Sequence, residues 1–161
     1  MMFGFSALYH RVNWKPKVLG LMRRLDHSSI FMMIAGTFTP ICLLVLPMAT
    51  GKNLLIIIWV IAGLGILQSI IFTNMPRLLR ASFYLGAGYL AIPYMSVMSS
   101  FMGYTNFALT VAGGTIYSVG AISYGFKFPD ISPKYFGFHE FFHLLVCIAA
   151  ILHFIVIYSI V

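Results

Sequence analysis

Five histidines and three acidic residues are the side chains of this 161-residue chain best suited to bind a metal or move protons. Most of them fall into three short clusters. Residues 6–10 read Ser-Ala-Leu-Tyr-His, residues 26–29 Asp-His-Ser-Ser, and residues 139–143 His-Glu-Phe-Phe-His. Two histidines four residues apart share one face of a helix, and imidazole is a common zinc ligand. The sequence therefore favours a metal site that includes His139 and His143.

The same clusters supply the other groups that a catalytic zinc site needs. Such a site has three protein ligands and an open position for water. We expect His10 to be the third ligand beside His139 and His143. Asp26 would hold or deprotonate the zinc-bound water, whose acidity the metal raises. Ser6, one turn before His10 on the same helix face, would donate a hydrogen bond next to that ligand.

Simpler roles are open to several of these residues. Asp26 could be a helix cap, and His10 taken alone could be an interfacial histidine. We expect His27 at the interface and not at the metal, while His153 lies about 15 Å along a helix from the paired histidines, too far to join them. The last cluster also matches the HExxH pattern of zinc proteases, in which Glu140 would be the general base. No second protease signature follows it.

The elements that carry these clusters are expected to be membrane-spanning helices. The chain is 61% hydrophobic and 8% charged, whereas soluble domains carry about 25% charged residues. We predict an all-α, polytopic transmembrane helix bundle that forms a single domain over residues 1–161, with five full spans and a partial N-terminal helix at residues 1–10. A span takes about 20 apolar residues. The five predicted spans are residues 28–50, 54–73, 81–102, 106–126 and 139–161.

Prolines and cysteines refine this picture of the spans. Pro40, Pro47 and Pro93 lie within or near the ends of spans and should kink them. Cys42 and Cys147 lie inside apolar runs. We expect both cysteines to pack there, because two isolated residues make neither a disulfide framework nor a cysteine-metal site.

Basic residues predict the orientation of the chain in the membrane. The net charge is +7, and in so apolar a chain it indicates membrane orientation rather than nucleic-acid binding. Short links make neighbouring spans antiparallel, which leaves Lys52 on one side and nine basic residues on the other. Positive residues favour the cytoplasm, so we expect the metal site at the cytoplasmic face of a bacterial plasma membrane and Val161 outside. The nine are Arg11, Lys15, Lys17, Arg23, Arg24, Arg77, Arg80, Lys127 and Lys134.

With these residues in view, the chain resembles the hemolysin III family, bacterial relatives of the progestin and adipoQ receptors. The resemblance runs along essentially the whole chain and keeps the family's order of motifs. The matching segments are SALYH at residues 6–10, LDHSSIFMMIAGTFTP at 25–40, GGTIYSVGAISY at 113–124 and HEFFHLLV at 139–146.

This resemblance implies a seven-helix fold with a zinc site near the cytoplasmic face. Family members begin with a further helix and a full second helix, so it also implies that the first helix and part of the second are absent here. The family's serine, first histidine, aspartate and last two histidines match Ser6, His10, Asp26, His139 and His143.

Three functions are compatible with these observations. Receptor relatives and similar alkaline ceramidases are regarded as zinc-dependent lipid amidases, so the first is a zinc-dependent hydrolase of lipid amides, with membrane lipid as partner and substrate. The family name points to the second, a pore-forming or haemolytic channel, although few polar residues recur along the spans. The third is a ligand-binding receptor or sensor in which zinc is structural. The oligomeric state is left open.

Overall fold

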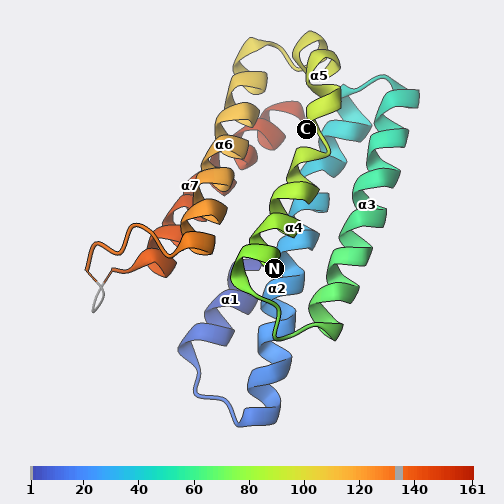
Figure 1. Cartoon of the computed structure of the whole chain (residues 1–161). Coiled ribbons are helices and arrows are strands. Elements are labelled where there is room, and N and C mark those ends of the chain that lie inside the picture. The colour runs from blue at the N-terminus through green and yellow to red at the C-terminus, as the bar shows by residue number, and fades with distance from the viewer. Residues whose placement is uncertain (1, 133–135) are drawn as a thin grey trace.

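The structure, a computed structural model, describes residues 2–132 and 136–161, and these ranges fold into helices (Figure 1). A π-helical segment, Ile41–Val45, continues α2, and a 3₁₀ turn, Ile92–Tyr94, joins α4 to α5. Within the described ranges the only β pairing is an isolated bridge between Ser132 and Phe136. The α-helices are α1 Met2–Arg11, α2 Pro16–Pro40, α3 Met48–Ile71, α4 Arg77–Tyr89, α5 Met95–Phe101, α6 Tyr104–Phe126 and α7 Phe138–Ile160.

Four of the described helices are long and apolar enough to cross a bilayer, as judged by length and composition. Large apolar side chains such as Leu44, Leu64 and Phe154 are exposed on them. A soluble protein would expose such a surface to water at high cost, whereas lipid chains cover it without penalty. The four are Pro16–Val45, Met48–Ile71, Tyr104–Phe126 and Phe138–Ile160.

The expected span at residues 81–102 is not one continuous helix. Helix α4 ends at Tyr89, and the chain passes through the 3₁₀ turn before α5 begins. Pro93 explains the position of the break, because it lacks the N–H that would bond to the carbonyl four residues earlier, that of Tyr89. Pro93 was expected to kink this span, and the structure shows a break there instead. The described part of the chain holds four uninterrupted candidate spans where five were expected.

Two helix boundaries differ from the expected ones. Helix α2 begins at Pro16 rather than near residue 28, since proline is well suited to the first turn of a helix. The link between the first two spans lies at residues 46–47, before α3, and not at 51–53. Pro47 immediately precedes α3, and Gly51 lies in its first turn, where an added Cβ would clash with the carbonyl oxygen of Cys42.

The helices surround an internal space. Helix α2 packs against α1 and α3, α4 packs against α6 and α2, and α6 packs against α7, which in turn contacts α2 and the π segment. Buried residues such as Phe31, Ile58 and Met98 form the core between them. The arrangement leaves α3 outside α2, and α1 at one end of the bundle (Figure 1).

Most basic residues belong to one end of this bundle. The α1–α2 connection and the turn from α3 to α4 lie at the lower end in Figure 1. Lys52 lies in the first two turns of α3, at the opposite end of that helix. Lys134 falls outside the described residues. The end that carries the basic connections is also the end at which α7 begins.

Candidate metal centre

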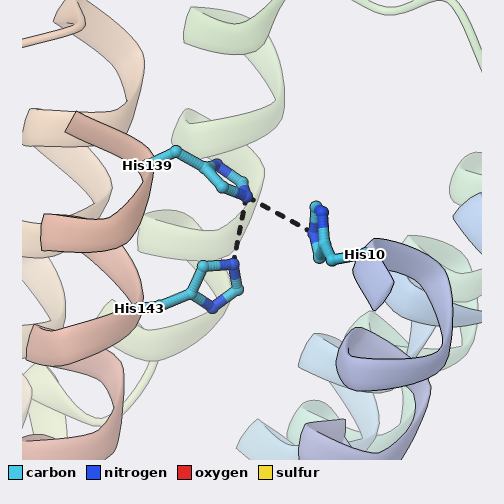
Figure 2. A group of neighbouring side chains, drawn as sticks. All are labelled: His10, His139 and His143. Carbon is cyan, nitrogen blue, oxygen red and sulfur yellow. Dashed lines mark hydrogen bonds between the residues drawn. The ribbon is translucent and has the colours of Figure 1, made fainter. Parts of the chain in front are cut away.

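His10, His139 and His143 come together in space although more than a hundred residues separate the first from the others. His10 lies near the end of α1, and the paired histidines lie in the first two turns of α7 with their rings directed at it (Figure 2). The Nε2 atom of His139 is 3.3 Å from Nε2 of His10 and 3.1 Å from Nε2 of His143. One ligand atom from each residue lies within 4.8 Å of the other two.

These nitrogen separations suit a zinc ion. Zinc–imidazole bonds are about 2.0–2.1 Å long, and a tetrahedral arrangement therefore places two ligand nitrogens about 3.3–3.4 Å apart. The two separations at His139 fall within a few tenths of an ångström of that value. A single proton on Nε2 of His139 serves two neighbouring nitrogens poorly. A cation between the rings would satisfy the lone pairs of all three.

The two helices that carry the histidines are held by local contacts. The indole N–H of Trp14 donates to the carbonyl of Leu8 at 2.8 Å and closes the chain back onto α1. At the other helix, the backbone N–H of Gly137 donates to the Glu140 carboxylate at 3.0 Å, which caps the start of α7. Glu140 thus caps a helix and is absent from the lining of the cavity beside the histidines. Because its carboxylate is engaged at the helix start, Glu140 is poorly placed to be the general base of an HExxH protease.

Asp26 and Ser6 lie beside the cluster. Both line the same cavity as the three histidines. The Ser6 hydroxyl is placed to hydrogen-bond to the Asp26 carboxylate, and the His10 ring is close enough for a Coulombic interaction with it. Asp26 is 9% exposed and belongs to the third turn of α2. The alternative that Asp26 caps the helix is therefore wrong, because the helix starts ten residues earlier at Pro16. Asp26 is not in the group of three ligand atoms.

Arg80 is a buried residue of this region that the sequence did not single out. Its Nη1 atom lies 3.2 Å from Nε2 of His27, and its Nη2 donates to the carbonyls of Thr73 and Met75, each at 3.2 Å. Arginine only donates, so this nitrogen of His27 accepts. The contact ties the α3–α4 turn to α2 next to Asp26 and occupies His27 away from the histidine cluster.

His153 also lies where the sequence predicted, apart from the cluster. Its Nε2 is 3.1 Å from the carbonyl oxygen of Thr110 on α6. The ring packs over Gly113, where an added Cβ would lie 2.5 Å from Nε2 of His153. His153 therefore fastens the second half of α7 to the first half of α6.

One cavity connects these features. Its volume is about 810 Å³, and side chains from α1, α2, α4, the 3₁₀ turn, α5, α6 and α7 line it. The histidine cluster and Asp26 border it near the end with the basic connections. Away from them the lining becomes mostly apolar, with residues such as Ile34, Phe38 and Met98. The volume is in the range of pockets that hold drug-sized ligands.

The fold and this cluster define a multi-pass helical membrane protein with three histidines gathered at one end of an internal cavity. A family model described as "Haemolysin-III related" matches residues 1–154. The chain belongs to this family, as the motifs in its sequence indicated.

Curated relatives agree with this assignment. The chain is 40% identical over 124 residues to "Hemolysin-3" of Bacillus cereus, and 37% identical over 122 residues to "Hemolysin-3 homolog" of Bacillus subtilis (strain 168). Each alignment covers 76% of this chain, and 55% and 57% of those two relatives. The human "Monocyte to macrophage differentiation factor" is 26% identical over 98% of the chain and 65% of the relative. No solved structure matches the chain.

Proposed function

We propose that this protein is a membrane zinc hydrolase that cleaves an amide bond in a lipid, with His10, His139 and His143 as the zinc ligands. The observation that carries the proposal is the convergence of three imidazole nitrogens next to a buried carboxylic acid at one end of a largely apolar cavity. An amphiphile could place its polar, reactive part beside the histidines and its hydrocarbon part in the apolar region.

The protein's own residues would bind the metal and handle the proton. When bound, zinc would supply polarisation of the amide carbonyl and activation of a water molecule. A carboxylate oxygen of Asp26 would accept the proton of the attacking water and then deliver it to the leaving nitrogen, the two steps of general acid–base catalysis. The Ser6 hydroxyl, beside Asp26, would orient that carboxylate. The apolar lining would hold the lipid chain and keep bulk water from the site.

The proposed site belongs at the cytoplasmic face of a bacterial plasma membrane, with the C-terminus outside. The support is the gathering of basic residues at the connections on the histidine side of the bundle, since positive loops favour the cytoplasm. Fusion of a reporter active only in the periplasm to Val161 would report the side of the C-terminus. We expect the periplasmic reporter fused to Val161 to be active. Activity of a cytoplasmic reporter at the same position would show that the C-terminus faces the cytoplasm and contradict the proposed orientation.

Two other functions use the same fold. The names of the bacterial relatives refer to haemolysis and motivate a pore. The apolar lining of the cavity beyond the histidines favours a binding chamber over a water-filled path. A receptor that binds a lipid without turnover would share every ligand with the hydrolase, so a turnover assay separates the two.

The experiment combines metal analysis with turnover. Protein purified in a neutral detergent is analysed for zinc and incubated with a fluorogenic long-chain N-acyl amide. We expect about one zinc per chain and release of the fluorophore, and loss of both in the His139→Ala plus His143→Ala variant. The His153→Gln variant, which changes a histidine of the same helix outside the cluster, should keep its zinc. Protein without stoichiometric zinc, or with zinc retained in the double variant, would refute the proposal.

A further inference from the structure

A second group of polar side chains lines the cavity near the end with the basic connections. Arg23 precedes Asp26 by three residues and His27 by four on α2, so it shares their helix face. Arg77 precedes Arg80 by three residues on α4 and shares its face in the same way. All three arginines border the cavity.

These arginines are not matched by acidic residues. The whole chain holds three acidic side chains, and of these only Asp26 borders the cavity. Arg80 is the arginine with a Coulombic interaction with the Asp26 carboxylate. Within the ranges 2–132 and 136–161, neither Arg23 nor Arg77 forms an ion pair. Two positive charges therefore remain without a counter-charge in the mouth of the cavity.

The two guanidinium groups keep donors available. Arg23 donates from Nη2 to the Asn74 side chain at 3.3 Å, but its buried Nε has no hydrogen-bond partner among the described residues. The Cζ atom of Arg77 lies 5.3 Å from the centre of the Phe138 ring, which brings the guanidinium to the start of α7 beside His139. A buried donor without an acceptor is costly unless a ligand supplies one.

Orientation in the membrane does not require a basic residue to line the cavity. Positive residues near the cytoplasm need only reach water or lipid headgroups, as the exposed Arg24 does. Arg24 follows Arg23 directly in the chain, yet it does not line the cavity. Arg23, which is half-buried, and Arg77, which is exposed, both line the cavity, so lining the cavity is what sets them apart from Arg24.

We propose that Arg23 and Arg77 bind the phosphate group of an amphiphile whose hydrocarbon part lies in the apolar region of the cavity. The planar guanidinium fork matches phosphate oxygens and forms charge-assisted hydrogen bonds with them. Free inorganic phosphate offers the same chemistry without the hydrocarbon part. Phosphate binding at this site requires neither zinc nor turnover. A failure of this proposal would therefore leave the proposed hydrolase untouched, and the reverse also holds.

Native mass spectrometry of the full chain, released from a neutral detergent after removal of metal with a chelator, tests this site. The probes are dodecyl phosphate, dodecanol and inorganic phosphate. We expect one dodecyl phosphate per chain, bound at least about tenfold more tightly than dodecanol, because a hydrogen bond to a charged group contributes that much or more. Equal binding of dodecyl phosphate and dodecanol would overturn the proposal.

Variants decide whether the two arginines bind the phosphate group of dodecyl phosphate. Arg23→Gln and Arg77→Gln should each weaken dodecyl phosphate binding about tenfold, while the matched Arg24→Gln variant should bind like the unchanged protein. An equal loss in Arg24→Gln would overturn the proposal, since it would mean general attraction to positive charge. Displacement of dodecyl phosphate by equimolar inorganic phosphate would support the site with the free anion as its ligand, and resistance to displacement would support it with a phospholipid-like ligand. Unchanged thermal melting shows that each variant is folded.

Discussion

Removal of one histidine from the cluster should weaken zinc binding by a calculable amount. His143 contributes an Nε2 atom 3.1 Å from that of His139. Four-ligand structural zinc sites bind with apparent free energies of about 10–16 kcal/mol, so one ligand accounts for roughly 2.5–4 kcal/mol. His143→Ala should therefore raise the dissociation constant for zinc by about two to three powers of ten. A water molecule that enters the vacated space would replace part of the lost bond and favours the lower figure.

The assay is competition between the detergent-solubilised protein and a chromogenic zinc chelator of known affinity. His153→Gln is the matched control, because His153 lies on the same helix and borders the same cavity but bonds to the Thr110 carbonyl. Its zinc affinity should stay within about threefold of the unchanged protein. A loss below about tenfold in His143→Ala, or an equal loss in the control, would refute the assignment of His143 as a ligand.

Other substitutions test the remaining parts of the account. Asp26→Asn should keep zinc and lower amide hydrolysis by about 10²–10⁴-fold, the usual contribution of a general base, and loss of zinc together with activity would instead make Asp26 a ligand. Ser6→Ala should lower hydrolysis less than Asp26→Asn does, and an equal or larger loss would contradict its orienting role. Gly65→Ala should destabilise the fold by about 1–3 kcal/mol, measured by thermal melting in detergent, because the new Cβ would clash with the Phe31 ring. Gly63→Ala, two residues away with open space around it, should be neutral or slightly stabilising, and equal effects of the two would contradict the packing described here.

The membrane-spanning class and the order of the helices were readable from the sequence because apolar runs of about 20 residues leave few alternatives. The break near Tyr89 was harder to place, because Pro93 was expected to kink the span and not to end a helix. A proline can kink a helix or end it, and the choice depends on how neighbouring helices satisfy the freed carbonyls.

The start of α2 was misplaced for a related reason. Hydropathy locates the apolar part of a helix and not its polar first turns, so residues 16–27 read as a connection. Asp26 therefore looked like the opening residue of a span, although it lies well inside α2. Pro16 was the local signal that could have corrected this, because proline is favoured in the first helical turn.

The three histidines could be brought together from topology, since alternating spans place residues 10, 26 and 139–143 at one end of the bundle. The arginines of the cavity could not be placed in that way. Arg23 and Arg24 are neighbours with the same chemistry, and only the packing of α2 against its partners decides which one faces inward. The three- and four-residue spacings from Arg23 to Asp26 and His27 were the signal that was missed.

X-ray absorption spectroscopy at the zinc edge of the purified full chain tests the central claim most directly. We expect about one zinc per chain, with three imidazole nitrogens about 2.0–2.1 Å from the metal and a further oxygen ligand. Substitution of His10 by alanine should reduce the imidazole contribution while Arg24→Gln leaves the spectrum unchanged. Protein without zinc, or a spectrum with sulfur ligands at about 2.3 Å, would contradict a metal centre formed by His10, His139 and His143.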